Sequence, residues 1–227
     1  MVEEMYKKAI ENNSDIVLCN YYEIYENKKI EKKPWKEYSK DVSVNYILFN
    51  PSLWNKLIKT KVIRDNNIKF LENHIYEDLA TIPILGGCTT KISYIEKPLY
   101  NYIIRENSTM RQPVYNKKLD SIFVAIDHLE EQFKSRNLLE KYYSEIEYLN
   151  IYHLLYAASG RFLEYKGGIN KLKNIKKIIK ETYPEWRKNK YYKKQNLIFK
   201  ISCNIFYSNN LIIINIYKMA RKIMKLK

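Results

Sequence analysis

The stretch "HIYEDLATIP", residues 74–83, places two adjacent acids, Glu77 and Asp78, before a short apolar run. A carboxylate within hydrogen-bond reach of a substrate hydroxyl can take its proton as a general base. Two acids at the start of a helix also interact favourably with the helix dipole, which contributes about 0.3–1 kcal/mol. The dipeptide fits both roles, so the elements around it have to decide between them.

Residues 1–112 read as an α/β arrangement whose strands flank these acids. "DIVLCNYYEIY" passes from a continuous apolar run into alternation, which predicts a strand that is buried on both faces at its start. "SLWNKLIK" and "KISYIEKPLYNYII" predict two more strands, the latter with Pro98 at a break or an edge. Residues 26–40 are rich in charge and predict a loop or hairpin.

Besides a short helix in "KDVSVNYILFN", capped by Asp41 or Ser43 and ended by Pro51, three helices are predicted near these strands. In "EEMYKKAIENNS", Met5, Ala9 and Ile10 share one helical face. "TKVIRDNNI" fits a helix with Thr60 as its N-cap, and "YEDLATIPILGG" fits a helix that its final Gly-Gly pair closes. The two acids then lie in the first turn of the third helix.

The pattern changes to helices in the second region, residues 113–227. Apolar residues between 119 and 133 follow i, i+3, i+4, i+7 spacing, and further helices are predicted over roughly 138–165 and 169–183 and in the remaining tail. We therefore expect an α/β region over 1–112 followed by an α-helical region.

The excess positive charge lies in the tail. The net charge is +15, and residues 165–227 hold 17 basic and two acidic residues, whereas residues 1–164 hold 23 of each. Lysines in the tail alternate with apolar residues, as in "NLIIINIYKMARKIMKLK". Segment 165–227 is therefore predicted to be a basic amphipathic tail.

Composition and missing motifs limit the function. No run approaches the ~18 apolar residues of a membrane-spanning helix, and the amphipathic, acid-containing start is not that of a signal peptide. The three cysteines lie far apart without a CxxC and the three histidines show no metal-ligand spacing, so we expect no metal site from them. GxGxxG, GxxxxGK[ST], GxSxG, HExxH and Asp-x-Asp are all missing. A cytoplasmic protein with reduced thiols is the simplest interpretation.

The order of the segments resembles one family. "SDIVLCNYYEIYENKK", then "PSLWNKLIKTKVIRDNNIKF", then "IYEDLATIPILGGCTTKISYIEKPLYNYIIRENSTM" is similar to the second half of a bacterial family 2, GT-A type, glycosyltransferase. The similarity covers residues 1–112 well and continues more loosely to "ETYPEWRKNKYYKK". It rests on Trp-Asn-Lys-Leu, an acidic pair 23 residues on, and an Arg-x-Asn-Ser segment.

The resemblance implies inverting transfer of a sugar from a nucleotide-sugar to a hydroxyl of a saccharide or lipid-linked acceptor, in cell-envelope polysaccharide or glycolipid synthesis. Asp78 would be the base that deprotonates the acceptor, and Glu77 would orient it or contact the acceptor. The diphosphate leaving group needs positive charge and, in the intact enzyme, a divalent Mg or Mn. Arg105 stands where the family often places a basic residue near that group, and an exposed salt bridge is the alternative.

Five other residues are candidates for substrate binding on the same basis. Trp54 could offer a stacking face to an acceptor sugar, with Asn55 and Lys56 beside it, although a core position is the commoner one for a large aromatic residue. Asn107 and Ser108 could shape the loop next to Arg105.

The sequence departs from the family at its beginning. In the family a nucleotide-binding βαβ half comes first and ends in an Asp-x-Asp that holds the metal. This sequence begins at the helix that normally follows that motif. We therefore expect a truncated, acceptor-side half that binds no metal and is inactive alone.

Two other interpretations stay open. One is a non-catalytic α/β-helical module that binds another subunit or an anionic membrane surface, peripheral on the inner face of the cell membrane. The other, nucleic-acid binding, rests only on the basic tail, lacks a recognised motif and is disfavoured.

Overall fold

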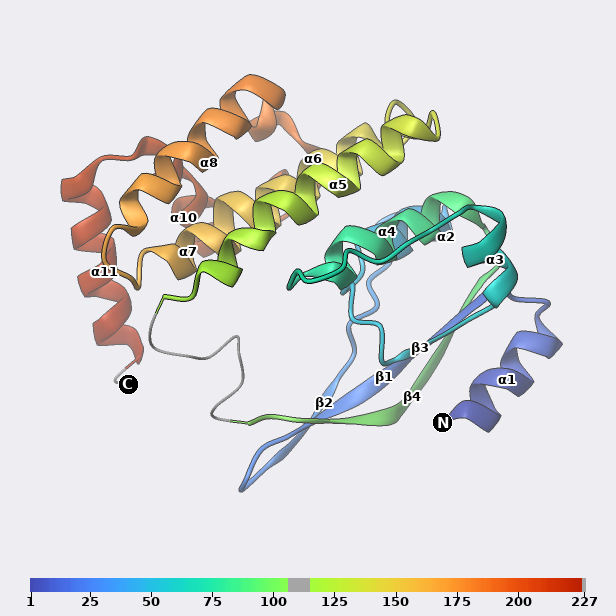
Figure 1. The fold of residues 1–227 in the computed structure, drawn as a ribbon. Coiled ribbons are helices and arrows are strands. Elements are labelled where there is room, and N and C mark those ends of the chain that lie inside the picture. Colours follow the sequence, from blue (N-terminus) through green and yellow to red (C-terminus); the bar gives the residue numbers. More distant parts are fainter. Residues whose placement is uncertain (106–114, 226–227) are drawn as a thin grey trace. The chain divides into compact units, whose positions relative to one another are not determined.

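The computed structural model describes residues 1–105 and 115–225 of the chain. The chain forms two compact units, Met1–Pro113 with Val124–Lys141 and Val114–Phe123 with Tyr142–Lys227. Figure 1 shows a β-sheet with flanking helices in the first unit and helices in the second. An α/β arrangement followed by a helical C-terminal region, as predicted, is what the described residues form.

Within the described residues the sheet has four strands, and β1 (Ile16–Ile24) is its central strand. β4 (Ile92–Ile103) runs parallel to β1 along its whole length. On its other side β1 pairs antiparallel with β3 (Lys56–Ile58) near its start and with β2 (Lys29–Lys32) near its end. The first six residues of β1 are all buried, which confirms the prediction of a strand buried on both faces at its start.

Helices cover both faces of this sheet (Figure 1). α1 (Val2–Glu11) packs on one face, where Met5 meets Val17 and Cys19. α2 (Val42–Ile47) and α4 (Glu77–Cys88) pack against each other on the opposite side, and α3 (Thr60–Asp65) follows β3. The packing on each side of the sheet thereby fixes the positions of β3 and α4.

Two local predictions about helix ends are wrong. Thr60 is the first residue of α3, and Lys59 occupies the N-cap position without a capping side chain. α4 does not end at its Gly-Gly pair but continues to Cys88. Gly86 instead permits close packing, because a Cβ there would lie 2.8 Å from a ring carbon of Tyr46.

The predicted apolar face of α1 is also only partly right. Met5 is fully buried and Ala9 packs beside it. Ile10 is 66% exposed, because it borders an open cavity between α1 and β3 and is not packed in the core. The buried face of α1 is therefore narrower than the sequence predicts.

The second unit is built from helices. A continuous helical stretch combines α6 (Tyr143–Asn150), a π-helical segment (Ile151–Ala158) and α7 (Ser159–Phe162), and spacing alone did not predict the π-helical part. Four more helices follow, α8 (Gly168–Thr182), α9 (Lys190–Lys193), α10 (Leu197–Ser208) and α11 (Leu211–Lys225). α5 (Ser121–Ser135) spans the boundary between the two units. Of the helices described, none is long and apolar enough to cross a membrane.

Candidate functional site

Helix α4 begins with the two acids and follows an unusual backbone conformation. Glu77 and Asp78 lie in its first turn, after Tyr76 at the N-cap position. Tyr76 has φ 69° and ψ 23°, in the left-handed region. That region costs a bulky residue on the order of 1 kcal/mol or more, so the surrounding fold must hold it there. Neither acid is the N-cap, and their contribution to the helix start is an interaction with its dipole.

Asp78 is half-buried, whereas Glu77 is exposed. The Oδ1 atom of Asp78 accepts a hydrogen bond of 2.7 Å from the backbone N–H of Leu79. Burial raises the pKa of the Asp78 carboxyl, the Leu79 N–H and the charge of Lys56 lower it, and Glu77 adds to the rise. A carboxylate whose pKa is raised accepts a proton more readily, which suits a general base.

Lys56 is buried at the first residue of β3, with its ammonium surrounded by oxygen atoms. Its Nζ donates to the carbonyl oxygen of Asn50 at 3.0 Å, to that of Ser52, and to Oδ1 of Asn55 at 3.1 Å. Burial lowers the pKa of Lys56 to about 7, and the negative charge of Asp78 acts in the opposite direction. Lys56 and Asp78 therefore form an electrostatic pair between β3 and α4, in which each favours the charged form of the other.

Asn55 is fully buried and ties the turn before β3 to the central strand. Its Nδ2 donates to the backbone carbonyl oxygen of Cys19 at 2.9 Å, and its backbone carbonyl oxygen accepts from the Cys19 N–H at 3.1 Å. Its Oδ1 accepts from the Ser52 hydroxyl at 3.0 Å as well as from Lys56. Asn55 thereby fixes the turn that supplies the oxygen atoms around the Lys56 ammonium, which we call the cage of Lys56.

Trp54 lies in the turn before β3, because the strand begins only at Lys56 and is shorter than "SLWNKLIK" predicts. Its ring stacks on those of Tyr100 and Tyr102, with centroids 4.6 and 5.0 Å away, and meets Tyr21 edge-on at 4.6 Å. The two stacked tyrosines are two residues apart in β4 and so share one face of the strand. Trp54 is half-buried within this aromatic cluster.

The remaining candidates lie beyond β4. Arg105 is exposed and follows the end of that strand. Asn107 and Ser108 lie outside the described residues. The structure therefore joins Lys56 and Asn55 by a hydrogen bond, places Asp78 near enough to Lys56 for their charges to interact, and sets Trp54 in the adjoining turn.

The resemblance implies a metal ion, which would need a group of closely placed ligands. Within residues 1–105 and 115–225, no three His, Cys, Asp or Glu side chains gather in a group. These residues do not fit a Mg or Mn site, since such ions are held by closely placed carboxylates.

Sequence reasoning missed two features of this site. The carbonyl groups of Asn50 and Ser52 bind Lys56, and only Pro51 between them signals the turn that aims these carbonyls inward. The left-handed conformation of Tyr76 has no signal in the sequence, because a tyrosine is among the residues least expected there.

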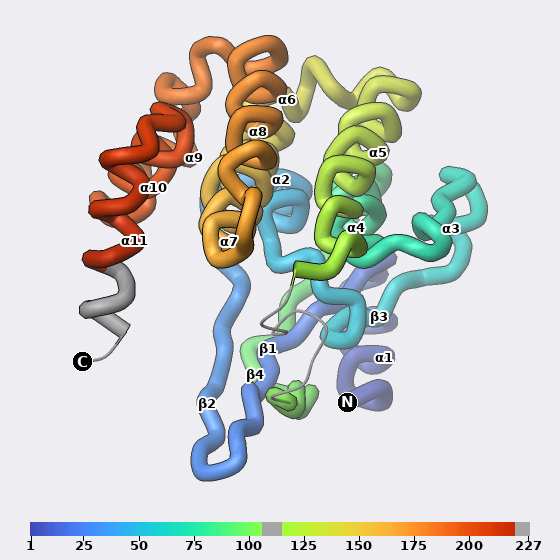
Figure 2. Tube along the Cα trace, turned by 60° about the vertical axis from the view of Figure 1, so that its left-hand side comes forward, coloured from blue at the N-terminus to red at the C-terminus, as the bar shows by residue number. Residues whose placement is uncertain are grey.

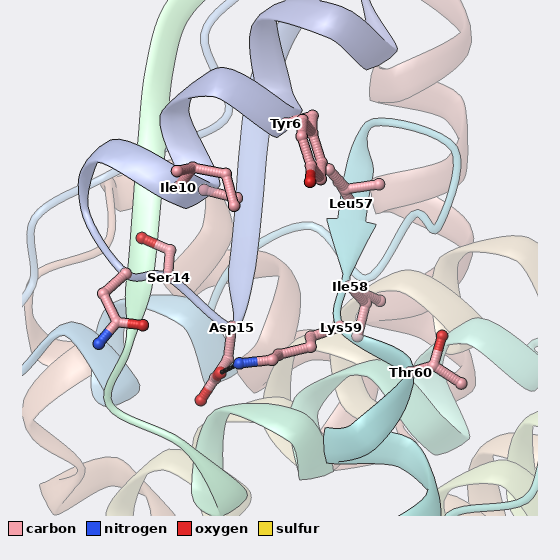
Figure 3. A pocket seen from close by; sticks show the side chains of 10 residues that line it. Tyr6, Ile10, Ser14, Asp15, Leu57, Ile58, Lys59 and Thr60 are labelled. Carbon is pink, nitrogen blue, oxygen red and sulfur yellow. Dashed lines mark hydrogen bonds and ion pairs between the residues drawn. The ribbon is translucent and has the colours of Figure 1, made fainter.

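A cavity of about 550 Å³ lies between α1 and β3 (Figure 3). Its lining is mainly apolar and includes Tyr6, Ile10 and Leu57. Figure 3 shows Asp15 and Lys59 pointing toward each other beside it, with Nζ and Oδ1 3.3 Å apart. Leu57 follows Lys56, and successive side chains of a strand point to opposite faces. The cavity is thus distinct from the Lys56–Asp78 pair.

No protein-family model matches the chain, and no curated protein matches it either.

Proposed function

We propose that this chain forms the acceptor side of a GT-A type, family 2 glycosyltransferase. The observation that supports the proposal is the half-buried carboxylate of Asp78 at the start of α4, paired with the buried ammonium of Lys56. These two residues belong to the "IYEDL" and "WNKL" segments on which the family resemblance rests. A pair of charges in one partly buried site, each altering the pKa of the other, is typical of catalytic centres.

In the proposed reaction an acceptor hydroxyl attacks the anomeric carbon of the donor sugar. The hydroxyl oxygen forms the new bond to this carbon while the bond from the carbon to the diphosphate oxygen breaks, and the electrons of that bond leave with the diphosphate. The hydroxyl proton passes to a carboxylate oxygen of Asp78. Attack from the side opposite the leaving group inverts the configuration at the anomeric carbon.

Lys56 and Glu77 have supporting roles in this proposal. The charge of Lys56 lowers the pKa of Asp78 and so keeps part of it ionised and ready to accept the proton. Glu77 is exposed beside it, where it can contact the acceptor. The oxygens that surround Lys56 hold its ammonium away from the substrate, so we assign it to positioning and electrostatics.

A nucleotide-binding half would supply the donor side of the site. That half would also hold the Mg or Mn of the intact enzyme. Arg105 would stand near the leaving group, and the aromatic cluster of Trp54 would border the acceptor. The acceptor would be a saccharide or lipid-linked saccharide of the cell envelope, which places the protein in the cytoplasm, peripheral on the inner face of the membrane.

The test is sugar transfer by the natural polypeptide or complex that contains these residues, purified from its own cells through a tag on this chain. Nucleoside diphosphate release is measured for a panel of nucleotide-sugars and membrane-extracted acceptors. Asp78→Asn should lower the rate by about 10²–10⁴, the usual scale for a general base, and Glu77→Gln should lower it less. Normal turnover by a folded Asp78→Asn protein would remove Asp78 from the mechanism.

A second candidate function is a non-catalytic module that binds another subunit or a membrane surface. The apolar cavity between α1 and β3 favours a protein partner, since among the described strands β3 pairs only with β1 and leaves its other edge open. Purification through the tagged chain separates the two functions, because the module would copurify with a partner yet release no nucleoside diphosphate.

A further inference from the structure

Two helices at the C-terminal end of the second unit expose large apolar side chains. Figure 2 shows α10 and α11 side by side, and the ring of Phe206 meets that of Tyr217 edge-on at 5.3 Å between them. Six exposed side chains, which we call the α10–α11 apolar surface, are Leu197, Ile198, Ile201, Ile212, Ile216 and Met219. Between 46% and 72% of each side chain is exposed, which is unusual for so many large apolar residues on two neighbouring helices.

The exposed side chains follow helical spacing. Ile212, Ile216 and Met219 stand at i, i+4 and i+7 of α11, on one face of that helix. The inner faces are already used, because Phe199, Cys203 and Phe206 of α10 are buried. Ile214 of α11 is also buried, so each helix has buried residues in addition to its exposed apolar side chains.

The segment that carries this surface has charges of one sign. Residues 186–227 contain 11 basic residues and no acidic one. Lys218 is exposed on α11, and three further basic residues, Arg221, Lys222 and Lys225, follow within the same helix. Lysines beside an apolar helical face are the pattern of helices that lie in the interface of anionic membranes.

We propose that the α10–α11 apolar surface docks on an anionic lipid surface, with α11 lying in the plane of the interface. Its apolar side chains enter the boundary between headgroups and acyl chains, and the basic residues meet the lipid phosphates. A second copy of the chain fits less well, because an isologous dimer through this surface would bring the two basic segments together. The proposal concerns a membrane contact and does not depend on the transferase reaction.

The test is flotation of the full chain with two kinds of vesicle, phosphatidylcholine alone and phosphatidylcholine mixed with phosphatidylglycerol. We expect the protein to float with the mixed vesicles at low salt, to float poorly with the neutral ones, and to be released as salt rises. The triple substitution Ile212→Gln, Ile216→Gln and Met219→Gln should weaken binding to mixed vesicles about tenfold or more, since each change removes an apolar side chain from the interface. Lys218→Glu should reduce the preference for the anionic vesicles.

A matched control is available on the first unit. The side chains of Val2, Tyr6 and Ile10 of α1 are 60–66% exposed. Their replacement by glutamine changes the same number of apolar side chains as the α11 variant does, at similar exposure. This control should bind like the wild type, and far-ultraviolet circular dichroism should show unchanged helix content in both triple variants. Equal flotation with neutral and anionic vesicles, or full binding by the α11 variant, would overturn the proposal. So would a dimer in sedimentation that the α11 variant abolishes, because the surface would then be occupied by a second copy.

Discussion

Replacement of Lys56 by methionine tests the electrostatics of the candidate site directly. Burial lowers the pKa of Lys56 from 10.5 to about 7, so between these two values the unfolded chain binds a proton that the folded chain does not. The free energy of unfolding must then rise with pH across this range. The destabilisation by Lys56 is complete below about pH 7 and disappears as the pH approaches 10.5.

The magnitude follows from the same two values. A fall in pKa from 10.5 to about 7 corresponds, at about 1.4 kcal/mol per unit, to a cost on the order of 5 kcal/mol at low pH. Between about pH 7 and pH 9 roughly 2 kcal/mol of this cost should disappear. Lys56→Met also removes the Lys56 donor from the carbonyl oxygens of Asn50 and Ser52, at about 1–3 kcal/mol for each that stays unsatisfied, whereas Oδ1 of Asn55 keeps the Ser52 hydroxyl as a donor. The slope with pH, and not the absolute stability, is therefore the diagnostic quantity.

Urea unfolding followed by tryptophan fluorescence provides the assay. A Trp186→Phe background leaves Trp35 and Trp54, both in the first unit, as the only reporters. In this background the protein with Lys56 should gain roughly 2 kcal/mol between about pH 7 and pH 9 relative to Lys56→Met. Lys61→Met, at an exposed lysine whose partner Asp65 raises its pKa, is the control and should keep the slope. Equal slopes for the proteins with and without Lys56 would refute the buried ammonium.

Three further predictions concern the acids, the helix packing and the donor side. Burial raises the pKa of Asp78 in the folded protein. Its stabilising contribution is therefore present below its unfolded pKa and is lost as the pH rises through its folded pKa. Asp78→Asn should then unfold at the same or a higher urea concentration at neutral pH, while sugar transfer falls. A clear loss of stability would make Asp78 structural. Gly86→Ala should lower the free energy of unfolding by about 1–3 kcal/mol, because the new Cβ meets the buried ring of Tyr46, and an unchanged urea midpoint would contradict that packing. Calorimetric titration of this chain with nucleoside diphosphates and Mn²⁺ should detect no micromolar binding; such binding would disprove the assignment of the donor side to another half.

The elements of the first unit could largely be predicted because local pattern and tertiary environment agree there. β1 starts as an apolar run, and its first residues are buried between α1 on one side and the helices on the other. Pro98 was expected at a break, and it pairs with Asn20 where the register between β1 and β4 shifts. Local errors arose where packing overrode a local rule, as at Gly86, where a residue that commonly ends helices instead makes room for the neighbouring helix.

The site itself could be predicted only in part. The acids were recognisable from their position before an apolar run, but the cage of Lys56 is a tertiary feature made by backbone carbonyls, which carry no side-chain identity. Lys56 was expected beside an acceptor because the family resemblance placed it next to Trp54 there, and burial of a lysine is uncommon. Its contact with those carbonyls explains why the structure places it in the interior instead.

The candidate site contains two costly features, the left-handed Tyr76 before α4 and the buried Lys56 at the start of β3. Such features persist where a fold over-determines them, and they concentrate at functional sites. A purely structural alternative is that Lys56 only fastens the turn of residues 50–55. The two interpretations differ in what Lys56→Met does to Asp78, since the charge of Lys56 lowers the pKa of that carboxyl.

If Lys56 supports the base, its removal should raise the pKa of Asp78 further. The acidic limb of the pH–rate profile for sugar transfer would then move to higher pH in a Lys56→Met enzyme, because more of Asp78 is protonated at each pH. Lys56→Arg, if it folds, should keep the limb close to its wild-type position, since it preserves the charge. A lysine that only fastens the turn would leave the limb unmoved in both variants, and lost activity would then follow lost stability. The position of that limb therefore separates an electrostatic partner of Asp78 from a structural lysine.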